Sequence, residues 1–396
     1  MKEFLFKLFC AYLKARKNKR NTISQLSFEL NFEKNIFKLY QSILNKNYQI
    51  SPSLAFIINQ PVKREIFASD FKDRVVHHYL YFHLYPIIDK KLIYDCYSCR
   101  KNKGTLLAIL RQTNFLKELS NNYKKPLFVL KLDISGYFMN INKNILYKNL
   151  RQIINNDLSK YSTKTQEILH YLIYKNIFHD PSLNCKIKGQ RSDWNNLPKS
   201  KSLFHSSPNC GLPIGNLTSQ LYGNVYLNPL DHYIKRVLKI KGYGRYVDDL
   251  VLMHEDKNYL KYCLNKIQNK LENDFHLNLH PNKIQFATAQ QGFYFLGQYI
   301  KPWRRYVARR PKNSAYKTMK EINNKEDLNK NLSSINSYLG LFKHCQSFNL
   351  RKKMMSLINP LVLENLEIKA DLSKVIINKE VKEKLQNKLK NKYLKD

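Results

Sequence analysis

The sequence has few acidic residues, no apolar run of membrane-spanning length and no recognisable leader. A transmembrane helix needs about 20 consecutive apolar residues, and no stretch approaches that length. The basic residues near the start follow the apolar positions of residues 4–13, which is the wrong order for a signal peptide. We therefore expect a cytoplasmic protein that does not associate with a membrane.

Cysteine is present but not in a pattern that implies disulfides or zinc. The 7 cysteines are odd in number and scattered along the chain, which favours free thiols in a reducing compartment. Cys96 and Cys99 form a lone CxxC pair, without a second pair or a histidine at zinc-finger spacing. Packed thiols are therefore favoured over a zinc or redox site.

Positive charge is what the sequence has in excess. Lys and Arg total 68 against 30 Asp and Glu, a formal net charge of +38, and 43% of the residues are hydrophobic. That mixture is typical of a folded, basic chain and not of a disordered one. Lys and Arg on a folded surface gain affinity for a phosphate backbone by releasing condensed counterions. A nucleic acid is the favoured partner, and compositional drift or a membrane surface are the alternatives.

Three aspartates stand beside short apolar segments. Asp133 follows the apolar residues 129–132, which only Lys131 interrupts, and Asp248 and Asp249 precede the apolar residues 250–253. Each is therefore predicted at the end of a buried strand, where an unpaired charge is costly. Two Mg²⁺ ions roughly 3.5–4 Å apart, with Mn²⁺ as a substitute, would satisfy these acids and promote phosphoryl displacement. The pattern predicts nucleotidyl transfer.

The periodicity along the chain alternates between helices and strands. We expect an antiparallel sheet with helices on one face, and an irregular inserted region at residues 180–209. His77 and His78 fall in mid-helix, where packing or solvent exposure is favoured over metal ligation. The expected helices are residues 23–50, 73–88, 218–236, 257–273 and one from about 144; the expected strands are 127–132, 244–253 (strand, turn, strand), 283–288 and 293–300.

Five segments, taken in order, resemble motifs A to E of reverse transcriptases. Two upstream segments, Lys63-Arg64-Glu65-Ile66 and Asp73-Arg74-Val75-Val76, look like the finger motifs of the same enzymes, and the resemblance covers about residues 50–345. The five segments are Asp133 with Phe138, residues 211–220, residues 246–249, His280-Pro281-Asn282-Lys283, and Phe295-Leu296-Gly297.

The resemblance implies an α+β fold of right-hand polymerase architecture, with fingers, an antiparallel ferredoxin-like palm and a helical thumb. Residues 1–50 would be an N-terminal helical extension and residues 51–126 the fingers. Residues 127–300 would be the palm, with the inserted loop region at 180–210. Residues 301–396 would be a basic helical thumb and C-terminal tail, in which no nuclease signature is visible.

The chain is most similar in its motifs to the reverse transcriptases of diversity-generating retroelements. Residues 94–104, 132–138, 201–204 and 211–220 carry this resemblance, and Ser219-Gln220 stands where retrons and group II intron enzymes usually show Ser-Pro. Such a bacterial or phage element copies a template RNA into cDNA with errors at adenines. Cys99, Asn102 and Gly223 depart from the pattern. A reverse transcriptase of antiphage defence and an inactive RNA-binding scaffold are the alternatives.

The resemblance also assigns roles at the metal site. Asp133 and Asp248 would bridge both Mg²⁺ ions, the Ile134 carbonyl would add a ligand, and Asp249 would be a ligand or a support behind one. Phe138 would lie beneath the incoming sugar and exclude a 2′-hydroxyl, with an ordinary core aromatic as the alternative.

Further residues would bind the substrates, which are template RNA, the RNA–cDNA duplex and dNTPs; a small basic helical accessory protein is an implied partner. Lys63, Arg64 and Arg74 would bind the triphosphate, and Lys283 would protonate the leaving pyrophosphate. The remaining roles fall to Gly215 and Asn216 at the nascent base pair, Gln220 at the template or dNTP, Phe295, Leu296 and Gly297 as primer grip, and Arg304, Arg305, Arg309, Arg310 and Lys343 in the thumb.

Overall fold

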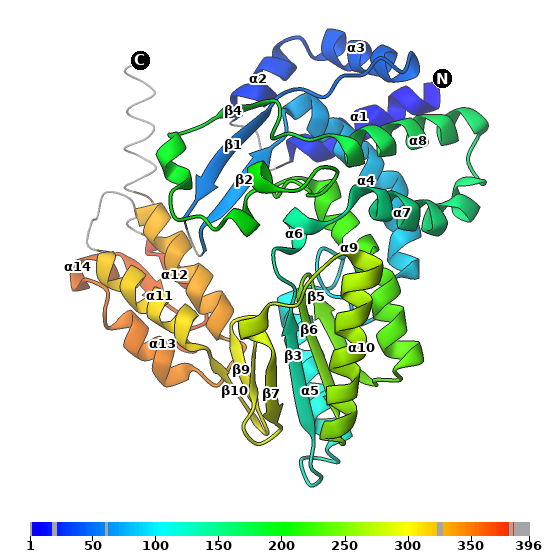
Figure 1. The fold of residues 1–396 in the computed structure, drawn as a ribbon. Coiled ribbons are helices and arrows are strands. Elements are labelled where there is room, and N and C mark those ends of the chain that lie inside the picture. The colour runs from blue at the N-terminus through cyan, green and yellow to red at the C-terminus, as the bar shows by residue number, and fades with distance from the viewer. Residues whose placement is uncertain (1, 18–21, 60–61, 323–327, 380–382, 384–396) are drawn as a thin grey trace. The chain divides into compact units, whose positions relative to one another are not determined.

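The computed structural model describes residues 2–17, 22–59, 62–322, 328–379 and 383 (Figure 1). Most of the C-terminal tail expected from the sequence, residues 384–396, therefore lies outside the described residues. The chain divides into two compact units, one of Met1–Gly104 with Leu130–Phe286 and one of Thr105–Val129 with Ala287–Asp396. No helix among the described residues is both long and apolar enough to cross a lipid bilayer.

The first unit begins with three helices that pack on a long central one. The helices are α1 (Lys2–Arg16), α2 (Ile23–Leu30) and α3 (Phe32–Leu44), and α1 lies along α4 (Phe71–Lys91). Phe4 of α1 places its ring 5.3 Å from both Tyr40 and Tyr79, which joins α1 to α3 and α4. The helices predicted for residues 23–50 and 73–88 are confirmed, and the first of them is two helices.

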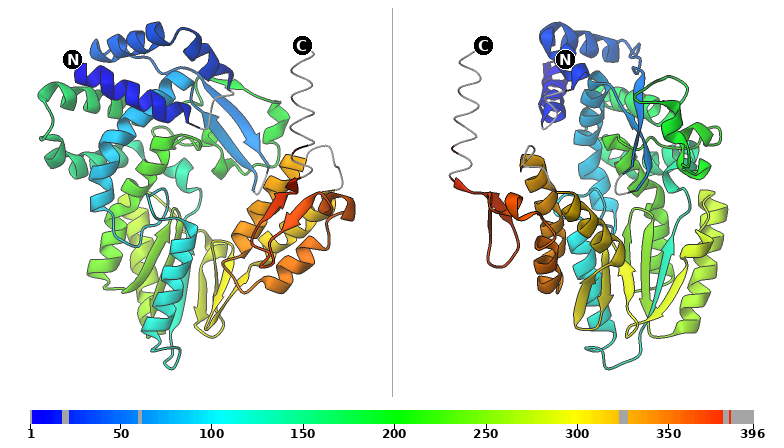
Figure 2. Two further views of the ribbon diagram at one scale, coloured as in Figure 1. Left: turned by 180° about the vertical axis from the view of Figure 1, so that it is seen from behind. Right: turned by 90° about the vertical axis from the view of Figure 1, so that its left-hand side faces the viewer.

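A small sheet forms one end of the first unit. Strands β1 (Ser53–Ile58) and β2 (Arg64–Ala68) are an antiparallel hairpin, and β4 (Cys185–Ile187) pairs with β1 in parallel. Figures 1 and 2 show this sheet at the opposite end of the unit from β3, β5 and β6. The inserted region predicted at residues 180–209 is largely irregular, and besides β4 it holds the short helical turns η1 (Arg191–Trp194), η2 (Lys199–Lys201) and η3 (Leu203–His205).

The buried carboxyl group of Glu65 ties this inserted region to the hairpin. It accepts hydrogen bonds from Trp194 Nε1 at 2.6 Å, Ser202 Oγ at 2.7 Å and the Leu203 backbone N–H at 2.6 Å. Glu65 is only 1% exposed. Three donors on one buried acceptor fix a segment that has little secondary structure of its own.

The four-stranded sheet that ends at the three aspartates has the order β5-β6-β3-β7. Its strands are β3 (Phe128–Asp133), β5 (Gly242–Tyr246), β6 (Asp249–His254) and β7 (Gln285–Thr288). The boundaries between the two units fall inside β3, after Val129, and inside β7, after Phe286. Strands β5 and β6 form an antiparallel hairpin with Tyr246 opposite Asp249. The strand, turn, strand predicted for residues 244–253 is confirmed.

Helices of the first unit pack on this sheet and on one another. Helix α10 (Lys257–Phe275) packs on β6, and α9 (Leu217–His232) packs on α4, α7 and α10 (Figure 1). Val251 and Leu252 of β6 and Leu260 of α10 are fully buried. The other elements are α6 (Tyr137–Asn140), α7 (Lys143–Leu158), α8 (Thr163–Phe178), the π-helical turn η4 (Tyr233–Val237) and η5 (Pro281–Lys283).

The second unit joins a three-stranded sheet to a set of C-terminal helices. Helix α5 (Thr105–Leu119) packs on the sheet of β8 (Phe293–Phe295), β9 (Gln298–Lys301) and β10 (Arg304–Val307). The predicted strand at residues 293–300 is therefore two strands, with a turn at Leu296 and Gly297. The remaining elements are α11 (Arg309–Glu321), α12 (Leu328–Phe342), α13 (Phe348–Met355), α14 (Pro360–Leu363), β11 (Leu366–Ile368) and β12 (Val375–Ile377).

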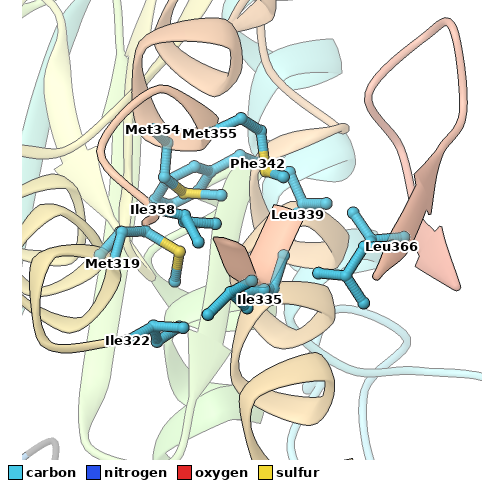
Figure 3. Close-up of a cluster of buried hydrophobic side chains, with 12 residues drawn as sticks. Met319, Ile322, Ile335, Leu339, Phe342, Met354, Met355, Ile358 and Leu366 are labelled. Carbon is cyan, nitrogen blue, oxygen red and sulfur yellow. The ribbon is translucent and has the colours of Figure 1, made fainter. Parts of the chain in front are cut away.

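The C-terminal helices enclose a core of their own. Figure 3 shows side chains of α11, α12 and α13 converging, with Leu366 from β11 beside them. Met319, Ile335, Leu339, Phe342 and Met354 are completely buried. This cluster lets the Lys- and Arg-rich segment fold, because its charged residues need only occupy the outer faces of the helices.

We expect Glu65→Ala to lower the free energy of unfolding by about 3 kcal/mol, because three donors lose their charged acceptor while remaining buried. Urea denaturation measures the change, and proteolysis within residues 185–205 should accelerate. Glu167→Ala is the matched control, since that side chain is 56% exposed in its pair with Lys46 and should change stability by less than about 0.5 kcal/mol. Equal effects of the two variants would contradict the anchoring role of Glu65.

Candidate active site

Backbone hydrogen bonds bring the three predicted aspartates together. The Ile134 N–H, just after Asp133 at the end of β3, donates to the Asp248 carbonyl at 3.2 Å. On its other side the same segment is held by the His280 N–H, which donates to the Asp133 carbonyl at 2.8 Å. Residues that are 115 positions apart in the sequence therefore meet at one edge of the sheet.

Two lysines lie against two of the three carboxylates. Lys283 Nζ is 2.8 Å from Asp133 Oδ1, and Lys131 Nζ is 3.1 Å from Asp249 Oδ1. The Lys283 side chain is 48% exposed, whereas that of Lys131 is 12% exposed. Lys283 can therefore swing away at small cost, while Lys131 is a fixed charge within the strand.

Asp248 is the carboxylate that its surroundings affect most. Burial, and to a lesser extent the nearby carboxylates of Asp249 and Asp133, raise the pKa of Asp248 to about 7. Burial also raises the pKa of Asp249, while Lys131 opposes that shift. The site thus holds more negative charge than its two lysines neutralise, and it favours the approach of a cation or of a proton.

The donor chemistry fits a divalent cation. Carboxylate oxygens are the ligands that Mg²⁺ and Mn²⁺ prefer. The pKa of Asp248 is raised by burial and then by its two neighbouring carboxylates, and a bound cation would offset both effects. Among the residues that the structure describes, however, no group of three or more His, Cys, Asp or Glu side chains is spaced to hold a metal ion. In this arrangement lysines lie where Asp133 and Asp249 would receive a cation.

The turn that carries Asp248 is strained. Val247 has φ of 58°, a left-handed conformation that is costly for a β-branched residue. Two bonds hold its peptide groups: Arg245 Nη1 donates to the Val247 carbonyl at 2.9 Å, and the Val247 N–H donates to Ser98 Oγ at 3.3 Å. These contacts fix the direction in which the next residue, Asp248, leaves the turn.

A fully buried ion pair supports that turn from behind. Arg245 of β5 bonds both oxygens of Asp231 of α9, through Nε at 2.8 Å and Nη2 at 2.6 Å, and both side chains have no exposed area. Tyr243 adds a third donor to Asp231 at 2.6 Å. Asn224 of α9 accepts from Ser98 Oγ at 3.1 Å and thereby joins the same network.

The lone CxxC pair is split by this arrangement. Cys96 is buried beside Arg245, its pKa is raised by burial to about 11, and its thiol faces Asn224 Oδ1 at 3.4 Å. Cys99 is exposed, with φ of 55°. Both are free thiols, in keeping with the reading of Cys96 as a packed residue.

The glycine turn before α9 lies directly on β2. The Phe67 N–H donates to the Ile214 carbonyl at 2.9 Å. Gly215 has φ of 121°, and a Cβ there would lie 3.0 Å from Ile66 Cγ2 and 3.1 Å from the Phe67 carbonyl. A side chain at Gly215 would therefore force the turn away from the hairpin.

A buried polar chain orients Asn216. Ser69 Oγ donates to Asn216 Oδ1 at 2.7 Å, and His77 Nε2 lies 3.1 Å from the same hydroxyl. Burial lowers the pKa of His77 to about 3, so the ring is neutral, and its Nδ1 contacts Thr218 Oγ1 at 2.8 Å. The packed role expected for His77 is confirmed, and its partners tie α4 to the glycine turn.

Phe138 lies against the start of α9. Its ring is half-buried, and a Cβ built on Gly223 would approach Phe138 Cε1 to 3.3 Å. Tyr137 anchors the same short helix by donating to the Gly223 carbonyl. Gly223 thus leaves room for the Phe138 ring.

The remaining predicted residues of the first unit differ in their surroundings. Arg74 Nε donates to the Ser69 carbonyl at 3.0 Å, and burial lowers the pKa of Arg74. Lys63 reaches the Asn195 carbonyl, and Arg64 and Gln220 are exposed. The chain from Arg74 through Ser69 to Asn216 joins two of the predicted nucleotide-binding residues, whereas Lys63 contacts the inserted region.

The predicted primer-grip residues belong to the second unit. Phe295 is fully buried, and Leu296 and Gly297 form the turn from β8 to β9 with φ of 46° and 87°. The Gly297 carbonyl accepts a hydrogen bond from the Ala308 N–H at 3.0 Å. These residues therefore form the turn that interrupts the strand predicted for residues 293–300.

Sequence reasoning missed Arg245, Asp231 and the role of Lys131. Each had a signal, because a charged residue inside an otherwise apolar strand or helix needs a buried partner. Lys131 was noted only as an interruption of the strand, and nothing in the sequence says that its partner is Asp249.

Replacing Arg245 with Met should lower the free energy of unfolding by about 3–5 kcal/mol, because Asp231 would be left as an unpaired buried charge. Adding Asp231→Leu should recover most of that loss, since an apolar pair removes both charges. Chemical denaturation of both variants measures the difference. Lys160→Met, which breaks an exposed ion pair with Asp157, serves as control. A double variant less stable than Arg245→Met would show that the site does not depend on the ion pair between Arg245 and Asp231.

Comparison with known proteins gives one family. Residues 63–300 match the family model described as "Reverse transcriptase (RNA-dependent DNA polymerase)". No curated protein matches the sequence closely enough to count as a relative.

Among solved structures, the chain is similar to telomerases of two Candida species. Apo telomerase of Candida tropicalis truncated from its C-terminal domain is 14% identical, with a TM-score of 0.48, over 66% of this chain and 55% of that one. Telomerase of Candida albicans in complex with a fragment of telomeric RNA is 12% identical, with a TM-score of 0.45, over 84% of this chain and 60% of that one. The chain thus spans less than two thirds of the length of either telomerase.

Proposed function

The chain belongs to the reverse transcriptase (RNA-dependent DNA polymerase) family, and on this premise we propose that it synthesises cDNA on a template RNA. The observation that carries the proposal is the meeting of Asp133 with Asp248 and Asp249 through the Ile134–Asp248 backbone bond. All three aspartates lie within the region that matches the family, residues 63–300. The proposed parts are fingers at residues 51–126, a palm at 127–300 and a basic thumb from 301.

Asp133 and Asp248 are the proposed ligands of two divalent cations, Mg²⁺ or Mn²⁺, with the Ile134 carbonyl and Asp249 completing the set. When bound, such cations activate the primer hydroxyl and stabilise the charge of the leaving pyrophosphate. Lys131 supports this assignment, because its positive charge 3.1 Å from Asp249 offsets the repulsion among three acids.

Lys283 is the proposed general acid. Its ammonium group is 2.8 Å from Asp133 and its side chain is 48% exposed, so the group is near the acids and able to move. A proton on Nζ can be donated to the pyrophosphate as its bond to the α-phosphate breaks. Lys63, Arg64 and Arg74 are proposed to hold the triphosphate, and Arg74 is already oriented by the Ser69 carbonyl.

Phe138 and the glycine turn are the proposed specificity elements. Phe138 leaves no room for a 2′-hydroxyl, which favours dNTPs. Gly215 and Asn216 contact the nascent base pair, Gln220 the template or dNTP, and Phe295, Leu296 and Gly297 the primer end. The ordered Ser69–Asn216 bond supports this role, because a fixed amide discriminates between partners better than a mobile one.

Motif B, ending in Ser219-Gln220, supports assignment to a diversity-generating retroelement of bacterial or phage origin. Its partners would be the template RNA, the RNA–cDNA duplex and a small basic accessory protein in the cytoplasm. A reverse transcriptase of antiphage defence shares the same acids and is the second candidate. An inactive RNA-binding scaffold is the third, and it would show no metal-dependent synthesis.

Asp133→Ala and Asp248→Ala should each reduce Mg²⁺-dependent extension of a primed RNA by on the order of a thousandfold or more. Each substitution removes a carboxylate that is proposed to hold the divalent cations at the reacting phosphate. Template binding, measured by fluorescence anisotropy, should change little. Asp157→Ala, a substitution on the surface of α7, is the control. Extension by either active-site variant at the wild-type rate would exclude the proposed site.

Deep sequencing of the cDNA made by the purified protein, with the candidate accessory protein, separates the biological roles. On a primed RNA rich in all four bases, a diversity-generating enzyme should place its errors opposite template adenines, and all product should disappear in Asp248→Ala. Faithful or untemplated product would instead assign the chain to the defence class.

A further inference from the structure

Three tyrosines form one row across the sheet of the second unit. Tyr294 of β8 is paired with Tyr299 of β9, and Tyr299 is paired with Tyr306 of β10. Directly paired residues project from the same face of a sheet. The alternate positions Phe293, Phe295 and Ile300 are fully buried on the other face. The tyrosine row therefore lies on the open face, where Tyr294 and Tyr306 are each 38% exposed.

The ring at the centre of the row is held in place. Tyr299 Oη donates a hydrogen bond to the Gln291 carbonyl at 2.9 Å, and Lys301 Nζ lies 6.0 Å from the centre of its ring. The neighbouring Gly292 has φ of 78°, which keeps the β7–β8 connection close to the sheet. The row is thus a preformed surface and does not depend on a ligand to order it.

Positive charge surrounds the row. Lys301 and Arg304 are paired with each other, two residues from Tyr299 and Tyr306 along their strands, and so they share the same face. Arg309 and Lys312 of α11 line the same hollow of about 860 Å³ as the three tyrosines. The residues that line this hollow include no Asp or Glu, and residues 275–320 contain none either, so the charge of the lining favours a polyanion.

We propose that this face, the tyrosine platform of Tyr294, Tyr299 and Tyr306, binds unpaired nucleotides of a nucleic-acid strand by base stacking. Aromatic side chains accept bases of any sequence on their faces, and adjacent cations neutralise the phosphates. A duplex keeps its bases stacked internally and presents its backbone, so it would leave the platform without partners. The inference rests on the proposed function only in taking nucleic acid as the substrate.

The test measures binding without metal ions or dNTPs, so its outcome does not depend on polymerisation. Fluorescence anisotropy compares a single-stranded 12-mer, as RNA and as DNA, with the same strand carrying abasic sites and with a blunt RNA–DNA duplex of equal length. For Tyr294→Leu with Tyr306→Leu, we expect affinity for the single strands to fall about tenfold or more. Affinity for the abasic strand and for the duplex should stay within about twofold of wild type.

Two matched variants accompany the measurement. Tyr294→Phe with Tyr306→Phe keeps both rings and should bind single strands as the wild type does, and Tyr262→Leu removes a tyrosine that is 49% exposed on α10 without effect. Unchanged single-strand binding by the Leu variant would overturn the proposal. An equal loss of affinity for the duplex would also overturn it, since the face would then bind the sugar–phosphate backbone and not the bases.

A measurement on the wild-type chain covers the case in which the Leu variant does not fold. A single strand carrying 5-iodouridine, irradiated on the protein, should crosslink to peptides that contain Tyr294 or Tyr306. Crosslinks confined to other peptides would overturn the proposal. If the strand is captured on the platform while the wild-type chain extends no primer, the platform stands and the proposed polymerase function fails. If the platform binds RNA strands more tightly than DNA strands, its ligand is the template RNA. If it binds both equally, its ligand is an unpaired strand of either kind.

Discussion

Negative charge is concentrated where β3 ends and where the β5–β6 hairpin turns, and neighbouring lysines partly neutralise it. Burial of Asp248, together with repulsion from the carboxylates of Asp249 and Asp133 at the same sheet edge, raises the pKa of Asp248 to about 7. Lys131 offsets the charge from within the strand and Lys283 from an exposed position. One lysine is thus held in place and the other is free to move, and together they reduce the repulsion among the three carboxylates.

The position of Asp248 also depends on a strained turn. A valine at φ of 58° is not stable by its own preference, so neighbouring groups must hold it. Arg245 does this through the Val247 carbonyl while it neutralises Asp231 on α9. A buried ion pair is weak evidence for stability, but here it joins the hairpin that carries Asp248 to the helix that follows the glycine turn. The buried ion pair therefore fixes the direction of Asp248, while the strained turn lowers the free energy of unfolding.

The two units use positive charge differently. In the first unit, the cations that matter are few and paired with named acids, and they adjust the charge of one site. In the second unit, residues 287–320 have no acid at all, and the cations flank an ordered row of tyrosines. The net charge of +38 is thus divided between local neutralisation and surfaces suited to a phosphate backbone.

The sequence by itself determined the family motifs, the three aspartates, the hairpin that carries Asp248 and most helices, because apolar periodicity and turn residues are local signals. It did not reveal that Lys131 faces Asp249, that Arg245 pairs with Asp231, or that Ser69 and His77 orient Asn216. It also did not reveal that residues 293–300 are two strands, which together with β10 place three tyrosines in one row. These are contacts between residues up to 147 positions apart or matters of strand register. Only the tertiary structure decides them, because they depend on which segments pack together and not on the preferences of any one segment.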